Sequence, residues 1–385
     1  MSHIAPSRIR PLVAALVLAV LLAIAAALAP GAHLATSGAA ASTAEPATYY
    51  VVRTRELAGA DAKASQAVTQ GTGRCNAHFG VKQFLTLTRL DAMFFQFTSN
   101  ASTGRIEDQT TKALGPGYLC GVPGTKGNDI DAYAYGKLAV GTVDASGGCR
   151  ISPQVLANVP VITSCLLTAK PQPAQGIDGA LITSNSIVNL LDKNGAAPTG
   201  SVWTAQVFGH TKNPVDTGAV KPAGIQPETP GLDFFVVRTR NETTPSTSPD
   251  CARAGVSGTP LAIRTADLAA AQPDATGKVP EPSGPSAGKL TVCYAYVSNK
   301  GYRAFAIADL HTASKTFSVR SVGDCKVSTT AAGADVRGLT CALDVKSGAK
   351  GGLVTSNGLI DAGKPASAAN SSVWTFALFG APAAS

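Results

Sequence analysis

Three segments of the first half of the chain recur in the second half, in the same order and almost letter for letter. The pairs are YYVVRTR (49–55) and FFVVRTR (234–240), GALITSN (179–185) and GGLVTSN (351–357), and SVWTAQVFG (201–209) and SVWTFALFG (372–380). This period is far longer than the roughly 20–50 residues of a solenoid repeat. The sequence therefore predicts two tandem homologous domains, over 45–209 and 233–385, joined by a Pro-rich linker over 210–232.

The eight cysteines follow the same repeat. They are Cys75, Cys120, Cys149 and Cys165 in the first copy, and Cys251, Cys293, Cys325 and Cys341 in the second. If each copy closes on itself, three pairings per copy are open. The last two cysteines of each copy have the same separation of 16, which favours a bridge between them and leaves the first two to form the other. An even number of cysteines without a C-x-x-C pair is typical of disulfides in an oxidising compartment.

The amino terminus has the order of an export signal. Residues 1–10 carry Arg8 and Arg10 and no acid, residues 11–29 form an unbroken apolar run, and residues 39–41 offer an A-x-A cleavage site. The run is longer than the ~7–15 apolar residues of a typical signal and close to the ~20 that span a bilayer. Residues 1–44 are therefore expected to be a cleaved signal peptide or a retained anchor. Either makes the protein secreted or extracytoplasmic.

The predicted fold class is mainly β, with each domain a β-sandwich or a barrel containing two disulfides. Segments such as Tyr49–Arg55 and Gly200–Phe208 are short, rich in β-branched and aromatic residues, and bounded by Gly, Pro or Asn. Leu290–Val297 and Tyr302–Leu310 flank a turn and predict a hairpin. Helical pattern is confined to two segments, Gln83–Met93 and Pro260–Ala271.

The two copies differ most in one region. The first copy reads FLTLTRLDAMFFQFT at 84–98, whereas the second has an Ala-, Pro- and Gly-rich stretch at 261–288. That composition predicts a long surface loop. If the two domains differ in function, we expect the difference to lie here.

The candidate ligand-binding residues are Arg53, Arg55, Arg238 and Arg240. Strand alternation places the two arginines of each VVRTR segment on one face. Two neighbouring guanidinium groups could bind a carboxylate, sulfate or phosphate. The alternative is a strand end that enters solvent or pairs with a neighbouring Asp.

Other residues that both copies retain are predicted to be structural. Trp203 and Trp374 occupy equivalent positions and are expected in the core rather than as stacking platforms. The Thr-Ser-Asn triplets at 183–185 and 355–357 are expected to end a strand and cap a turn.

Two tyrosine pairs also share a strand face, Tyr133 with Tyr135 and Tyr294 with Tyr296. Exposed pairs would suit sugar stacking. Buried pairs would be ordinary sheet residues, which is the role we expect.

Motifs of catalysis are missing from the sequence. It has no G-x-S-x-G, H-E-x-x-H, P-loop or G-x-G-x-x-G pattern. Asp309 and His311 could form a dyad on one strand face, and Asp129 with Asp131 could act as paired carboxylates. A surface pair and a solvated turn are the expected roles of these two groups. No metal site and no cofactor are predicted.

The net charge of +8 is diffuse and falls to about +6 without the leader, which gives no reason to expect a nucleic-acid partner. Duplication, paired cysteines and missing catalytic motifs together predict an exported, non-catalytic two-domain protein that binds an envelope, glycan or protein ligand or has a structural role. Contact with a membrane is expected only through an N-terminal anchor. The alternative is an extracellular hydrolase whose site is assembled from dispersed residues, in a pocket that joins His311 or the Asp129/Asp131 pair to the arginines.

Overall fold

The computed structural model describes fourteen stretches of the chain within one compact unit, Pro46–Ser385. They are residues 47–56, 66–81, 85–88, 92–125, 129–138, 141–152, 161–188, 200–209, 231–298 without 255–261, and 301–381 without 313, 332–335 and 362–371. The predicted leader over 1–44 and the predicted linker up to residue 230 lie outside the described residues.

The first β-rich part, which we call the N-terminal sheet, has nine strands among the described residues. They are β1 (Thr48–Glu56), β2 (Leu85–Thr88), β3 (Ala92–Ser99), β4 (Ile106–Pro123), β5 (Ile130–Leu138), β6 (Gly141–Ile151), β7 (Val161–Ala169), β8 (Gly179–Val188) and β9 (Gly200–Phe208). The strand order is β2-β4-β3-β1-β9-β8-β7-β6-β5. Because β4 also pairs with β5, the pairings of β1 and β3–β9 run round in a ring, with β2 added beside β4.

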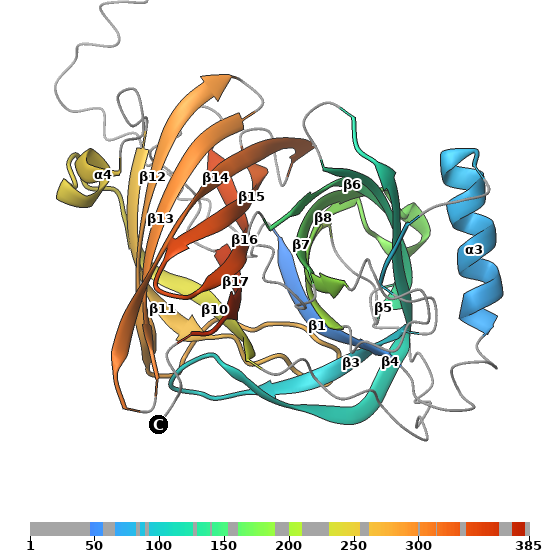
Figure 1. The fold of residues 1–385 in the computed structure, drawn as a ribbon, viewed down its shortest axis with the longest axis horizontal. Helices are drawn as coiled ribbons and strands as arrows, with labels where there is room; N and C mark the ends of the chain where they lie inside the picture. Colours follow the sequence, from blue (N-terminus) through green and yellow to red (C-terminus); the bar gives the residue numbers. More distant parts are fainter. Residues whose placement is uncertain are drawn as a thin grey trace, which may run out of the picture. The chain divides into compact units, whose positions relative to one another are not determined.

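The second β-rich part is a closed barrel of eight antiparallel strands in sequence order, which we call the C-terminal barrel (Figure 1). Its strands are β10 (Leu232–Thr243), β11 (Ala262–Ala270), β12 (Ser286–Ser298), β13 (Gly301–His311), β14 (Thr316–Ala331), β15 (Val336–Ser347), β16 (Gly351–Asp361) and β17 (Ser372–Phe379). Closure comes from the pairing of β17 with β10, which leaves no free sheet edge. The predicted mainly β fold is confirmed.

Alternation along the strands decides which side chains fill the barrel. On β13, Tyr302, Ala304 and Leu310 belong to the inner core, whereas Phe305 and Ile307 pack on the outside of the barrel. Small inward residues leave room for large ones that other strands supply, among them Trp374, Phe376 and Phe235. The predicted hairpin over 290–310 is confirmed as β12 and β13.

All four predicted disulfides are confirmed, and each lies within one of the two β-rich parts. Cys149–Cys165 and Cys325–Cys341 join residues directly opposite each other on neighbouring strands. The other two bridges, Cys75–Cys120 and Cys251–Cys293, tie a helix to the outside of a strand. No covalent bond other than the main chain therefore joins the N-terminal sheet to the C-terminal barrel among the described residues.

Apart from a short 3₁₀ helix, η1 (Pro173–Gln175), the described chain has two α-helices, and they are not where the sequence pattern placed them. They are α3 (Gln66–Phe79) and α4 (Pro249–Arg253), and they carry Cys75 and Cys251 (Figure 1). Neither is long and apolar enough to cross a membrane. Each packs its cysteine against the outer face of its own strands, in small buried clusters that include Tyr118 and Phe305 respectively.

Both predicted helices were wrong. The described parts of Gln83–Met93 belong to β2 and β3, and those of Pro260–Ala271 form β11 and its end. The predicted surface loop over 261–288 was too long at both ends. Its first described residues belong to β11 and its last residues to β12, so the segment between the two strands covers only residues 271–285. Closure of the barrel between β10 and β12 requires a strand at this position, and this tertiary demand overrides the helix propensity of its alanines.

Candidate functional site

The four candidate arginines do not form one exposed cluster. Arg53 and Arg238 are buried, with 3% and 0% of their surface exposed. Arg240 is half-buried and its Nη1 donates to the carbonyl of Gly284 at 2.6 Å. The side chain of Arg55 lies outside what the structure describes.

The two buried arginines instead lie across the contact between the N-terminal sheet and the C-terminal barrel. The guanidinium of Arg53 is 5.2 Å from the ring centre of Phe234, and that of Arg238 is 5.2 Å from the ring centre of Tyr49. Tyr49 and Phe234 are equivalent residues of the repeated segment, so the two cation–π contacts are reciprocal. Arg238 also donates to Glu281 Oε1 at 2.6 Å and to the carbonyl of Val279 at 2.9 Å. The use of these arginines to bind an external anion stays a prediction.

The repeated Thr-Ser-Asn triplets make a second reciprocal contact. Asn185 Nδ2 donates to Thr355 Oγ1 at 3.0 Å and to the carbonyl of Thr375 at 3.1 Å. Asn357 Nδ2 donates to the equivalent groups of the other part, the hydroxyl of Thr183 at 3.1 Å and the carbonyl of Thr204 at 2.9 Å. The prediction that the triplets end a strand and cap a turn was wrong, because they lie inside β8 and β16 and are fully buried.

A third reciprocal contact is made by the main chain. Val236 N donates to the carbonyl of Gly104 at 2.8 Å, and Val51 N donates to the carbonyl of Gly277 at 2.7 Å. Val51 and Val236 are equivalent residues of the repeat. The segment between β3 and β4 therefore reaches the first strand of the barrel, and the segment between β11 and β12 reaches the first strand of the sheet. The salt bridge from Arg105 Nη2 to Asp233, at 2.5 Å, joins the same elements.

We call the surface made by these contacts the reciprocal interface. Its apolar part is a buried cluster to which both β-rich parts contribute, including Tyr49, Val51, Phe234 and Val236. The residues that the two copies share in VVRTR and TSN thus bind the two parts to each other. This gives them a role that does not involve a ligand.

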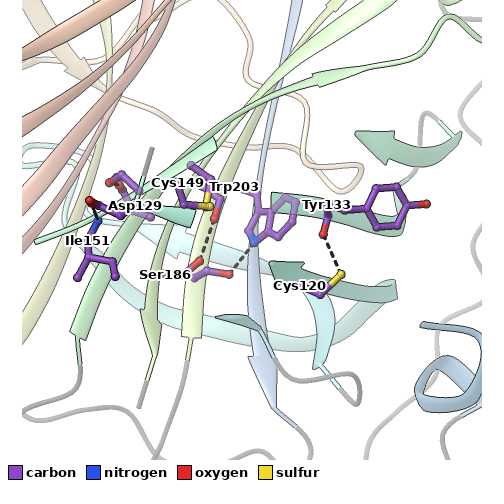
Figure 2. Close-up of a disulfide and its surroundings, with 12 residues drawn as sticks. Cys120, Asp129, Tyr133, Cys149, Ile151, Ser186 and Trp203 are labelled. Carbon is purple, nitrogen blue, oxygen red and sulfur yellow. Dashed lines mark hydrogen bonds between the residues drawn. A yellow bond between two sulfur atoms is a disulfide. The ribbon is translucent and has the colours of Figure 1, made fainter. Parts of the chain in front are cut away.

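The tryptophans confirm the core prediction. Trp203 and Trp374 are 2% and 1% exposed, and their indole N–H groups donate to Ser201 Oγ at 2.6 Å and Ser372 Oγ at 2.9 Å. Figure 2 shows Trp203 among the strands of the N-terminal sheet near Cys149.

The first tyrosine pair is covered rather than exposed. His78 of α3 stacks on the ring of Tyr133 with centroids 4.3 Å apart, and the Arg74 guanidinium lies 3.8 Å above the ring centre of Tyr135. Helix α3 therefore occupies the faces that a sugar would use. Burial raises the pKa of Tyr133.

The candidate acid groups have structural partners. Asp129 Oδ2 accepts from the backbone N–H of Ile151 at 2.6 Å (Figure 2), and Asp131 Oδ2 accepts from Thr125 Oγ1 at 2.7 Å. Asp309 Oδ1 accepts from Ser318 Oγ. Among the described residues no group of three or more His, Cys, Asp or Glu side chains is placed to hold a metal ion.

A cavity inside the C-terminal barrel brings together residues that the sequence patterns did not single out. The space is small, on the order of one or two water molecules. Arg264 and Glu242 are the two charged residues of its wall. The other lining residues are Thr239, Ala266, Leu290, Val292, Tyr294, Leu339, Ser356, Gly358, Ser372 and Trp374.

Strand alternation brings Arg264 into this cavity. It shares the inward face of β11 with Ala262, Ala266 and Leu268, of which Ala262 and Leu268 belong to the barrel core. Its side chain is 8% exposed, and its guanidinium lies 5.4 Å from the ring centre of Tyr294. A charge on the apolar face of an alternating strand is the signal that could have found it, once the segment is recognised as a strand.

Glu242 lies on β10, the strand that pairs with the β11 strand of Arg264, and its carboxylate is held by hydroxyl groups. Its Oε1 accepts from Thr239 Oγ1 and, at 3.5 Å, from Ser372 Oγ. Ser372 also binds Trp374, so one hydrogen-bonded chain links the carboxylate to the indole. The corresponding position after VVRTR in the first copy is Leu57, so this carboxylate belongs to the second copy only.

Tyr294 gives the cavity a measurable pH dependence. Burial, opposed by the Arg264 charge and assisted by the Glu242 charge, raises the pKa of Tyr294 to about 12. Because the neutral phenol is favoured in the folded protein, this contribution to stability is complete below pH ~10 and is lost as the pH rises toward 12. The free energy of unfolding of the parent protein should therefore fall between pH 9 and pH 12. In Tyr294→Phe this fall should be smaller by about 3 kcal/mol. Tyr296→Phe, on the exposed continuation of the same strand face, is the matched control, and an equal effect of both variants would contradict the assignment.

No family model, no curated protein and no solved structure matches this chain.

Proposed function

We propose that the protein is an exported, non-catalytic binding protein made of two homologous β domains, in which the C-terminal barrel holds a ligand site. The observation that carries the proposal is a buried charged side chain, Arg264, beside open space inside the barrel. The interior of an eight-stranded barrel is either filled by side chains or holds one small ligand.

The duplication is supported by more than sequence repetition. Equivalent residues make equivalent contacts in both directions at the reciprocal interface, as the Asn185 and Asn357 hydrogen bonds illustrate. Such self-complementary pairing is what a twofold interface between identical subunits looks like. A gene duplication that joined two such subunits would produce this arrangement.

Export is supported by the four disulfides, because such bonds persist in oxidising compartments. The apolar run at 11–29 supplies the signal or anchor that export requires.

Binding is favoured over hydrolysis by the position of the candidate acid groups. The hydrolase alternative depends on a pocket that joins His311 or the Asp129/Asp131 pair to the arginines. The cavity in the barrel is lined by none of these residues. Asp129 and Asp131 are instead hydrogen-bonded at one end of strands β4, β5 and β6, to the backbone N–H groups of Ile151 and Thr125 respectively.

The two tryptophans provide a direct test, because Trp374 lines the cavity and Trp203 lies in the other β-rich part. In a Trp203→Phe variant the fluorescence reports Trp374, and in a Trp374→Phe variant it reports Trp203. We expect at least one of two small probes, acetate or ethanolamine, to change the Trp374 signal saturably and leave the Trp203 signal unchanged. If no probe changes Trp374, or if both signals change alike, the cavity is not the binding site.

A further inference from the structure

The three nitrogens of the Arg264 guanidinium have different surroundings. Nη1 donates to the carbonyl of Leu359 at 3.3 Å, which fixes one corner of the group. Nε and Nη2 are both buried, and neither donates to any residue that the structure describes. These two nitrogens form one edge of the planar guanidinium, with their N–H bonds nearly parallel. The unused edge is therefore a two-pronged donor.

Leaving this edge without an acceptor is unfavourable. A buried charged donor that has lost its contact with water costs more than a neutral one, and the cost applies here to two nitrogens side by side. An oxyanion whose two oxygens are about as far apart as the two N–H groups would satisfy both. A carboxylate has this planar geometry.

The second charge of the cavity limits the charge of the ligand. Glu242 lines the same space, and its carboxylate is held on the wall by Thr239 and Ser372. Arg264 supplies one positive charge and Glu242 repels any anion, so a dianion would meet more repulsion in this space than a monoanion would. The small size of the space also favours a short acid or the carboxylate end of a longer one.

We propose that Arg264 binds the carboxylate of a small organic monoacid through Nε–H and Nη2–H, with Glu242 excluding dianions such as phosphate. This inference rests on the proposed binding role of the barrel and adds the chemical class of the ligand. Arg264 lies in the region where the two sequence copies differ most, and the first copy has Leu57 at the position of Glu242, so the N-terminal sheet is not expected to share the site.

The test is a titration with acetate, followed by Trp374 fluorescence in the Trp203→Phe background and by calorimetry. Arg264→Met keeps the length of the side chain without its donors and should weaken acetate binding at least tenfold. Glu242→Gln should strengthen acetate binding at least threefold and make phosphate binding detectable. Arg303→Met removes an exposed arginine that binds Asp324 on the outside of the same barrel. It should change neither the affinity for acetate nor the affinity for phosphate.

Thermal unfolding without acetate separates a ligand-binding role from a structural one. Because the unused edge of Arg264 is unfavourable in the free protein, Arg264→Met should unfold at the same temperature as the parent or higher. Equal acetate binding by the parent and Arg264→Met would overturn the inference, as would an equal loss in Arg303→Met. If ethanolamine changes the Trp374 fluorescence and acetate does not, the binding role stands and the carboxylate assignment fails.

Discussion

Replacing Gly104 by alanine is expected to destabilise the protein by about 3 kcal/mol, although the change adds a single methyl group. The backbone of Gly104 has φ of 71°, a left-handed conformation that costs other residues about 1–2 kcal/mol. A Cβ atom at this position would lie 2.6 Å from Val237 Cγ1 and 2.8 Å from the carbonyl oxygen of Val236. Both atoms belong to the first strand of the C-terminal barrel, so the methyl group would push the reciprocal interface apart.

Gly80→Ala is the matched control. Gly80 also has a positive φ, of 67°, but a Cβ there would have no neighbour within 4 Å. Its replacement should cost only the conformational part, about 1 kcal/mol. Gly277→Ala, the equivalent change in the other direction, places a Cβ 2.9 Å from Val52 Cγ1 and should resemble Gly104→Ala.

Denaturant unfolding with the disulfides intact measures all three variants. If Gly104→Ala costs no more than Gly80→Ala, the close contact across the interface is not present in solution.

The second large effect is expected from the buried amides. Asn357→Ala removes two hydrogen bonds across the interface and leaves the carbonyl of Thr204 and the hydroxyl of Thr183 buried with one partner fewer. We expect a loss of about 2–3 kcal/mol in the free energy of unfolding. Asn185→Ala removes the equivalent pair and should cost a similar amount.

The two amide substitutions should not be additive. The hydroxyls of Thr204 and Thr375 lie 3.2 Å apart between the two asparagines, so one network connects both sites. After the first substitution has loosened the interface, the second should cost at least 0.5 kcal/mol less than it does in the parent. Asn76→Ala, on helix α3 and away from the interface, should change stability by less than about 0.5 kcal/mol. Strict additivity, or an Asn357→Ala effect no larger than that control, would contradict the reciprocal arrangement.

Local chemistry in the sequence was sufficient to predict the disulfides and several of the strands, but not the longest one, β4. Cys149 and Cys165 have the same spacing as Cys325 and Cys341 because each pair joins the two strands of an equivalent hairpin. This spacing can be read directly from the sequence. The segments around Trp203 and Trp374 carry β-branched and aromatic residues that suit a half-buried strand.

The role of the repeated polar residues could not be predicted in this way. Asn185 and Thr183 look like turn residues because the sequence does not reveal that a second β-rich part covers their strand face. A buried amide with partners 170 or more positions away in the chain has no local signature. The repeated Thr-Ser-Asn triplets were therefore correctly identified as structural residues, but their predicted place in turns was wrong.

Arg264 was missed for a related reason. The alanines around it resemble a helix or a loop, and only a strand brings Arg264 to the inward face together with Ala262 and Leu268. The sequence did indicate the region, since 261–288 is where the copies diverge most. The charge of Arg264 becomes unusual only when the closed barrel buries it.

The reciprocal contacts predict that the N-terminal sheet and the C-terminal barrel hold each other together independently of the chain that joins them. Because each disulfide lies within one part, a protease site inserted in the predicted linker over 210–232 would leave no covalent connection after cleavage. The most direct measurement is the native mass of the cleaved protein, by size-exclusion chromatography with light scattering. We predict a single particle of the uncleaved mass that separates in denaturant, and two separate fragments in native buffer would contradict the claim.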